Sequence, residues 1–225
     1  MDFQLSFKVN EHIYLRDPES SELGKQIVKN AIDLIYELGF EHFTFKKLAT
    51  KMSTTEASIY RYFENKHRLL LYILNWYWSY MEFLVVFTIQ NIQDPKEKLI
   101  KIITLFTQSL PESVGQLDYN KSYLNQIVLS ESSKVYLIKE VKEINSFQVF
   151  KPYKDLCNKI SEVMLSLNPK YAYARSLSST LIETAHSQQY FSKNLPRLTD
   201  ISSEKDEKFV FNYLNQLVFS ALKPV

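Results

Sequence analysis

The scarcity of glycine constrains the fold of this chain more than any other feature of its sequence. Only three of the 225 residues are glycine (Gly24, Gly39 and Gly115), whereas glycine makes up about 7% of an average protein. Loops that cradle phosphates and β-rich folds that turn about every ten residues both depend on glycine. We therefore expect neither, and the sequence favours helices joined by turns of other residue types.

Composition narrows the class of protein further. Hydrophobic residues make up 45% and charged residues 23% of the chain, which is typical of a folded protein and excludes a disordered one. Aromatic residues reach 14%, so we expect a core rich in rings. The net charge is only +2, but residues 44–68 hold six Lys or Arg against two Glu. Such a local excess of positive charge indicates a partner rich in phosphate.

Catalytic and metal-binding patterns are weak. Cys157 is the only cysteine, which excludes an internal disulfide and fits a reducing cytoplasm. The first residues lack the features of a secretion signal, so we expect a cytoplasmic protein. Glu183 and His186 resemble half of a di-iron carboxylate motif, but no second Glu-x-x-His is present. We therefore expect no metal, no cofactor and no enzymatic activity.

The spacing of apolar residues predicts an all-helical chain. Residues 1–18 alternate between apolar and polar, which predicts two short strands or an extended arm. From residue 20 the period becomes helical, and Gly39 stands at the position of a C-terminal cap. Further helices are expected at 45–52, 55–62, 66–90, 95–110, 119–129, 132–145, 152–166, 170–192 and 205–222.

Residues 69–89 are long and apolar enough to cross a bilayer, with Glu82 as their only charge. Asn75 and Ser79 interrupt this run, and its flanks lack the Lys/Arg asymmetry of a membrane protein. We therefore expect a central helix that is buried on nearly all sides.

Residues 45–62 have the pattern of a helix-turn-helix, with two short helices on either side of Ser53-Thr54. Thr44 and Thr55 stand at the two N-cap positions. Leu48, Ala49 and Met52 of the first helix and Ile59 and Phe63 of the second are expected to point into the angle between them.

The outward face of the second helix is the expected DNA-contacting surface. Ala57, Tyr60 and Arg61 lie on this face, with Ser58 on its flank. Small side chains near the start of such a helix let its backbone approach a DNA groove. The helix start at Thr55 offers N–H groups to a phosphate, and Tyr60 and Lys66 can bind phosphates too.

The same segment resembles the DNA-binding signature of the tetracycline-repressor (TetR) family. The resemblance covers about residues 22–70 and rests on TFKKLA at 44–49 and TEASIYRYFENK at 55–66. Within the second run, Tyr60, Phe63 and Lys66 match the Tyr-x-x-Phe-x-x-Lys pattern of that family. It implies a three-helix DNA-binding domain followed by a larger helical bundle.

Three positions depart from the family pattern. Ser53 stands where the turn usually has glycine, and Thr54 stands where it has an apolar residue. Ser adopts a left-handed turn only at some energetic cost. Glu56 repels phosphate, although its carboxylate can accept a hydrogen bond from a cytosine amine. These departures concern the DNA sequence that is bound more than the fold.

The resemblance implies a homodimer that binds double-stranded DNA and an unknown small-molecule effector. We expect an N-terminal arm or short hairpin over residues 1–19, the helix-turn-helix domain over 20–66, and a ligand-binding and dimerisation domain over 67–225. The expected function is a DNA-binding transcriptional regulator, a repressor released from a pseudo-palindromic operator by an apolar or aromatic effector. The alternative is a helical ligand-binding or membrane-associated module whose helix-turn-helix no longer binds DNA.

Three groups of site residues follow from these patterns. The predicted DNA contacts are Thr44, Lys46, Thr55, Glu56, Ala57, Ser58, Tyr60, Arg61 and Lys66, of which Lys46 and Ser58 are candidates for base contacts. Aromatic residues at helical spacing predict either plain core or a ligand pocket, lined by Tyr72, Trp76, Tyr80, Phe83, Phe87 and Tyr123. In the family the last two long helices pair in the dimer, which implies an interface at Leu177, Leu181, Leu214, Leu217 and Val218.

Overall fold

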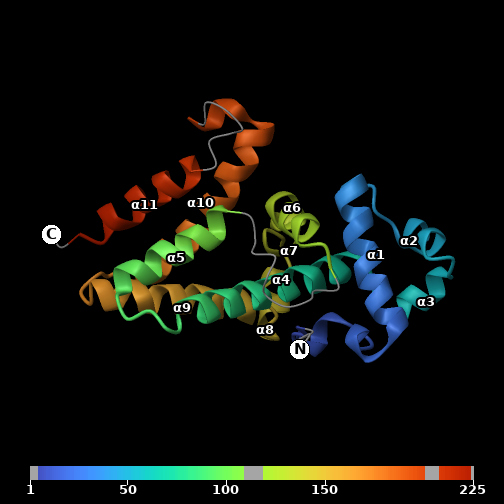
Figure 1. Ribbon diagram of the computed structural model, residues 1–225. Helices are drawn as coiled ribbons and strands as arrows, with labels where there is room; N and C mark the ends of the chain where they lie inside the picture. The colour runs from blue at the N-terminus through green and yellow to red at the C-terminus, as the bar shows by residue number, and fades with distance from the viewer. Residues whose placement is uncertain (1–4, 109–118, 201–207, 224–225) are drawn as a thin grey trace. The chain divides into compact units, whose positions relative to one another are not determined.

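The computed structural model of this protein describes residues 5–108, 119–200 and 208–223. Every regular element within these ranges is a helix (Figure 1), and the prediction of an all-helical fold is confirmed. The chain divides into two compact units. The first is Met1–Ser79 with Pro111–Lys151, and the second is Tyr80–Leu110 with Pro152–Val225. The three segments expected from the sequence follow other boundaries and stay a prediction.

The first unit contains the N-terminal helices. In chain order these are α1 (Glu22–Leu38), α2 (Phe45–Lys51), α3 (Glu56–Tyr60), the first part of α4 (Lys66–Ile89), α6 (Lys121–Glu131), α7 (Ser133–Tyr136) and α8 (Val141–Ser146). α1 packs against both α2 and α6, and α2 packs against α3. α1 therefore connects the helix-turn-helix with α6, which begins about eighty residues after the end of α1.

The second unit contains the rest of α4 and four further helices, which are α5 (Pro95–Thr107), α9 (Lys151–Leu167), α10 (Ala174–Asn194) and α11 (Phe209–Ala221). α10 packs against α5 and α11, and α11 also packs against α5. Its interior is apolar because side chains such as Leu99, Leu181 and Leu214 are fully buried.

The sequence predicts two short strands or an extended arm at the N-terminus, and the structure excludes the strands among the residues it describes. Residues 5–20 contain no strand, so the expected hairpin is wrong; short 3-10 turns form at Glu11–Ile13 and Pro18–Ser20. The segment nevertheless packs closely, because Ile13 is buried and the N–H of Leu15 donates to the carbonyl of Tyr62 at 2.8 Å. Alternating apolar residues here cover the first unit and pair with no second strand.

The predicted helix over residues 132–145 forms as two shorter helices, α7 and α8. The break falls at Leu137, whose backbone has φ −96° and ψ 49°. Neither glycine nor proline occurs there, so the sequence carried no local signal for a break. Tertiary packing overrides helix propensity at this point.

α4 is the central helix that the sequence predicted. Among the residues described, it is the one helix long and apolar enough to cross a membrane, and 78% of its most apolar stretch is buried inside the protein. Trp76, Tyr77 and Trp78 are each at most 4% exposed. This burial is the property expected of a core helix.

Candidate nucleic-acid interface

The helix-turn-helix forms as its sequence pattern predicted. Thr44 Oγ1 accepts from the N–H of Lys47 at 3.2 Å, and Thr55 Oγ1 accepts from the N–H of Ser58 at 3.3 Å. Both predicted N-caps are therefore confirmed, and each satisfies an N–H that the helix itself leaves unpaired. α3 is short, with only five residues.

The turn between α2 and α3 closes on a left-handed residue. Ser53 has φ 51°, its N–H donates to the carbonyl of Thr50 at 3.2 Å, and the N–H of Thr54 donates to Ala49 at 2.9 Å. This pair of bonds is a Schellman motif, which is usually closed by glycine. The serine is thus held in a conformation that its Cβ disfavours, as expected from its departure from the family pattern.

Opposite faces of α2 and α3 separate core from surface. Leu48, Ala49, Ile59 and Phe63 are at most 4% exposed, which confirms their predicted inward direction. Most of the predicted DNA contacts are exposed, namely Thr44, Lys46, Thr55, Glu56, Ala57, Tyr60 and Arg61, while Ser58 is half-buried. The tight packing beneath therefore holds a polar surface in a fixed geometry.

Two cations on this surface are free of partners. Lys46 and Arg61 make no ion pair or side-chain hydrogen bond in the part of the chain that the structure describes. By contrast, Lys47 donates to the carbonyl of His42 at 2.8 Å, and Lys51 lies 3.4 Å from Glu37. Lys46 and Arg61 are therefore the positive charges most available to a nucleic acid. Tyr60 lies beside them, 48% exposed, with its ring edge-on to Phe45 at 5.0 Å.

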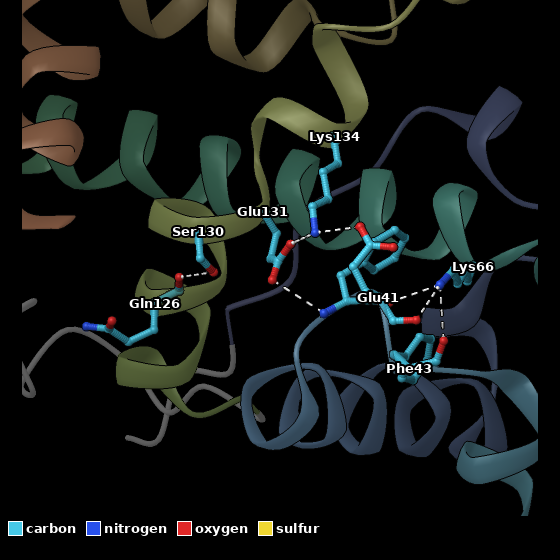
Figure 2. Close-up of polar contacts among 8 residues, drawn as sticks. Glu41, Phe43, Lys66, Gln126, Ser130, Glu131 and Lys134 are labelled. Atoms are coloured by element: carbon cyan, nitrogen blue, oxygen red, sulfur yellow. Dashed lines mark hydrogen bonds and ion pairs between the residues drawn. The ribbon is translucent and has the colours of Figure 1, made fainter. Parts of the chain in front are cut away.

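Lys66 is used differently from its prediction. Its Nζ donates to the carbonyls of Phe40 at 3.0 Å, Glu41 at 3.2 Å and Phe43 at 3.3 Å (Figure 2). A lysine ammonium has three N–H donors, and all three are engaged. The predicted phosphate contact is corrected accordingly, because Lys66 ties the start of α4 to the loop between α1 and α2 (residues 39–44, the α1–α2 loop).

The end of α6 holds the same loop from the other side. Glu131 Oε1 accepts from the N–H of Phe40 at 3.3 Å, and Lys134 Nζ lies 2.7 Å from Glu131 and 2.8 Å from Glu41 (Figure 2). The hydrogen bond from Lys134 lowers the pKa of Glu41. Desolvation lowers the pKa of Lys134, but its bonds to Glu131 and Glu41 outweigh this and raise it. We call Glu41, Glu131 and Lys134 the loop clamp.

The loop clamp was missed by the sequence analysis. Glu131 falls in the gap between the predicted helices 119–129 and 132–145, three residues before Lys134, which is an ordinary spacing for a surface ion pair. Their partner loop lies about ninety residues earlier in the sequence, and no local pattern connects the two. A second contact strengthens the same link, since the ring of Tyr123 on α6 stacks on Tyr36 of α1 at 3.8 Å. Tyr123 therefore packs on α1 rather than lining the predicted ligand pocket.

Comparison with known proteins identifies the N-terminal part of the chain. Residues 27–73 match the family model described as "Bacterial regulatory proteins, tetR family". This match places the N-terminal domain of that family at residues 27–73 of the chain. No protein with a curated description matches the sequence.

Solved structures share the fold of this chain at low sequence identity. AibR in complex with isovaleryl coenzyme A and operator DNA has a TM-score of 0.61 and 17% identity, with 88% of this chain and 98% of AibR covered. The fatty acid degradation regulator FadR from Bacillus halodurans has a TM-score of 0.59 and 18% identity, covering 86% and 92%. The superantigen PfiT has a TM-score of 0.57 and 17% identity, covering 92% and 96%.

The aromatic residues proposed for a ligand pocket are placed in several different environments. Tyr72, Trp76 and Tyr80 are at most 2% exposed. Trp76 meets the rings of Tyr119 at 5.0 Å and Phe7 at 5.3 Å, and Tyr72 meets that of Phe63 at 5.4 Å. Phe83 and Phe87 stack on each other, with Phe87 49% exposed. Core packing accounts for the buried rings, so their role toward a ligand stays a prediction.

Four of the five residues proposed for a dimer interface are buried within their own chain. Leu177 is 7% exposed, and Leu181, Leu214 and Val218 are fully buried. These four are corrected to core residues, because a side chain covered by its own fold offers no area to a partner. Leu217 is half-buried and stays a candidate. With Phe209 and Tyr213 it forms a partly exposed stripe at a spacing of four residues along α11.

Glu183 and His186 do not gather further metal ligands. Glu183 accepts from the hydroxyl of Tyr153 at 2.6 Å, and burial lowers the pKa of His186 to about 4. In the described ranges no group of three or more His, Cys, Asp or Glu residues could hold a metal ion.

Proposed function

We propose that this chain is a DNA-binding transcriptional regulator that contacts duplex DNA through α2 and α3. One observation carries the proposal. Lys46 and Arg61 are exposed without an ion pair, on a helix-turn-helix whose opposite face is buried. Cations free of intramolecular partners can neutralise phosphates, which is the main source of affinity for DNA.

The proposed contacts divide by their chemistry. α3 is the recognition helix, and the small side chains of Ala57 and Ser58 let it approach the major groove. Lys46 and Ser58 contact base edges, whereas Tyr60 and Arg61 contact phosphates. Glu56 is exposed at the start of α3, where it disfavours phosphate and can accept from a cytosine amine.

Dimerisation through α10 and α11 completes the proposal. Two recognition helices must reach successive major grooves about 34 Å apart, which a two-fold dimer achieves on a pseudo-palindromic operator. The half-exposed stripe of Phe209, Tyr213 and Leu217 on α11 supports a contact between copies. In this proposal residues 20–66 bind DNA in the cytoplasm, and residues 67–225 dimerise and bind an effector.

The effector in this proposal is a small apolar or aromatic molecule that releases a repressor from its operator. AibR, which shares the fold, was solved with isovaleryl coenzyme A and operator DNA together, which supports a small-molecule effector. The aromatic content of α4 supports an apolar or aromatic character for the effector of the present chain. Coupling of about 2 kcal/mol between effector and DNA gives near thirtyfold release.

The alternative is a protein of the same fold that does not bind DNA. Glu56 at the start of α3 favours it, and a shared fold does not fix a function. Selection of duplexes from a random pool, followed by anisotropy measurements, separates the two proposals. A regulator binds a selected duplex far more tightly than a scrambled one of equal length. Equal binding of both duplexes at low salt contradicts the regulator and favours the alternative.

A further inference from the structure

A pocket of about 480 Å³ opens in the first unit between the start of α4 and the helices α7 and α8. Its apolar wall consists of Leu71, Val135, Ile138, Ile144 and Phe147. Sites for small molecules commonly measure about 300–1,000 Å³ and combine an apolar lining with a few polar groups. The pocket has the size and the lining of a ligand site, and none of the exposed DNA-contact candidates on α2 and α3 lines it.

The charges around the pocket do not cancel. Arg68 lies 3.7 Å from Glu64, and Lys134 is held by Glu131 and Glu41 in the loop clamp. Both cations of the lining are thus already paired with carboxylates. Glu140 and Glu143 also line the pocket, and neither carboxylate has an ion pair or side-chain hydrogen bond in the described ranges. The unbalanced charge that faces the pocket is therefore negative.

The aromatic ring in the wall adds a second attraction for positive charge. Phe147 is 49% exposed. Its position is set by the ring of His12, whose centroid lies 4.5 Å away, and by Asn10 Nδ2, which donates to its carbonyl at 2.8 Å. A cation over the face of an aromatic ring is stabilised by the electron density of the ring, and more strongly where water is partly excluded.

We propose that this pocket binds an organic cation with an apolar body. The apolar wall accepts the body of the ligand, while Glu140, Glu143 and the ring of Phe147 attract its charge. An anion of the same shape meets two carboxylates without compensation and is repelled. This site is separate from the effector of the proposed function, and the ligand binds whether or not the chain binds DNA.

Two probes of nearly identical shape and opposite charge test the proposal. Tetraphenylphosphonium and tetraphenylborate are titrated into the full chain by calorimetry, in the absence of DNA. The phosphonium is expected to bind at one saturable site, and the borate is expected to bind more weakly. Equal affinity for the two ions contradicts the proposal, because the hydrophobic contribution alone does not depend on the sign of the charge.

Substitution of the two carboxylates locates the site. In the double variant E140Q/E143Q the phosphonium affinity is expected to fall about fivefold, as for two charge contacts of modest strength at a partly exposed site. The borate affinity is not expected to fall. E97Q is the matched control, since Glu97 is exposed on α5 and does not line the pocket. If E140Q/E143Q binds the phosphonium like E97Q, the pocket is not the site and the proposal fails, while the DNA-binding proposal is unaffected.

Discussion

The ammonium of Lys66 is joined to Phe40 in two ways: Nζ donates to the carbonyl at 3.0 Å and lies 4.6 Å from the centre of the ring. Lys66 is the first residue of α4, and Phe40 follows the end of α1. The same loop is held by Glu131 at the end of α6 and by Lys134 of α7. The α1–α2 loop is therefore fixed from both sides, so that α4 and α6 position the helix-turn-helix within the first unit.

Replacement of Lys66 by methionine is expected to lower stability rather than DNA affinity alone. The change removes three hydrogen bonds from a charged donor and leaves carbonyls of the α1–α2 loop without their partner. We expect a loss of about 2 kcal/mol in the free energy of unfolding, measured by urea denaturation. Lys46→Met is the control and should leave stability unchanged. If K66M is as stable as the wild type and its DNA binding depends less on salt, the result would instead show that Lys66 contacts a phosphate.

The loop clamp is expected to contribute measurably to stability. Lys134→Met leaves the carboxylate of Glu131, only 10% exposed, without its ion partner. We expect a loss of about 1–2 kcal/mol, discounted because the lysine itself is partly exposed. Ser130→Ala, on α6 next to Glu131, is the matched control, since the Ser130 hydroxyl donates to the carbonyl of Gln126, four residues earlier, and takes no part in the loop clamp (Figure 2). Equal stabilities of the two variants would show that the clamp contributes nothing.

The loop clamp also predicts a pH dependence with a defined sign. The pKa of Glu41 is lowered from 4.5 by Lys134, so its contribution is complete above pH 4.5 and is lost as the pH falls through the lowered pKa. The raised pKa of Lys134 gives a contribution that is complete below pH 10.5 and is lost as the pH rises through the raised value. As the pH falls below 4.5, the free energy of unfolding should therefore decrease less in K134M than in the wild type. Parallel stability curves in acid would contradict this expectation.

Ser53→Gly is expected to stabilise the protein. Ser53 has φ 51° at the end of α2, a conformation that costs a residue with a Cβ about 1–2 kcal/mol. Part of that gain is offset by the greater freedom of glycine in the unfolded chain, so we expect a net gain of about 0.5–1 kcal/mol. Ser53→Ala keeps the Cβ and should bring no gain. A glycine variant no more stable than the alanine variant would show that the strain is absent.

Arg61 and Lys46 should affect DNA binding differently if the proposed contacts hold. Arg61→Ala removes a phosphate contact, so it should weaken binding to all duplexes alike and reduce the salt slope by about 1. Lys46→Ala removes a base contact and should relax specificity, at a cost of about 1–3 kcal/mol on the preferred duplex.

The control for both DNA-binding variants is Lys170→Ala, because Lys170 is exposed in the loop before α10, outside the helix-turn-helix. Fluorescence anisotropy over a range of salt concentrations measures each variant. If K170A loses as much DNA affinity as R61A, the loss in R61A is explained by the change in net charge and not by a contact of Arg61 with DNA.

The sequence by itself determined the local structure of the helix-turn-helix. Thr44 and Thr55 cap their helices as predicted, and Ser53 adopts the left-handed turn that its position required. These features depend on hydrogen bonds between residues at most five positions apart, or on the φ preference of one residue. Such interactions form within a short segment, so a short segment of sequence contains the information to predict them.

Only the tertiary structure decided how the longer side chains are used. Lys66 matches a family pattern, yet its ammonium reaches a loop twenty-three to twenty-six residues earlier. Tyr123 has the spacing of a pocket residue but stacks on Tyr36, and Leu214 has the spacing of an interface residue but is fully buried. Periodicity shows that a residue lies on an apolar face of its helix. Either the same chain or a partner can cover that face. The outcome depends on the packing of helices that are distant in sequence, which local periodicity does not predict.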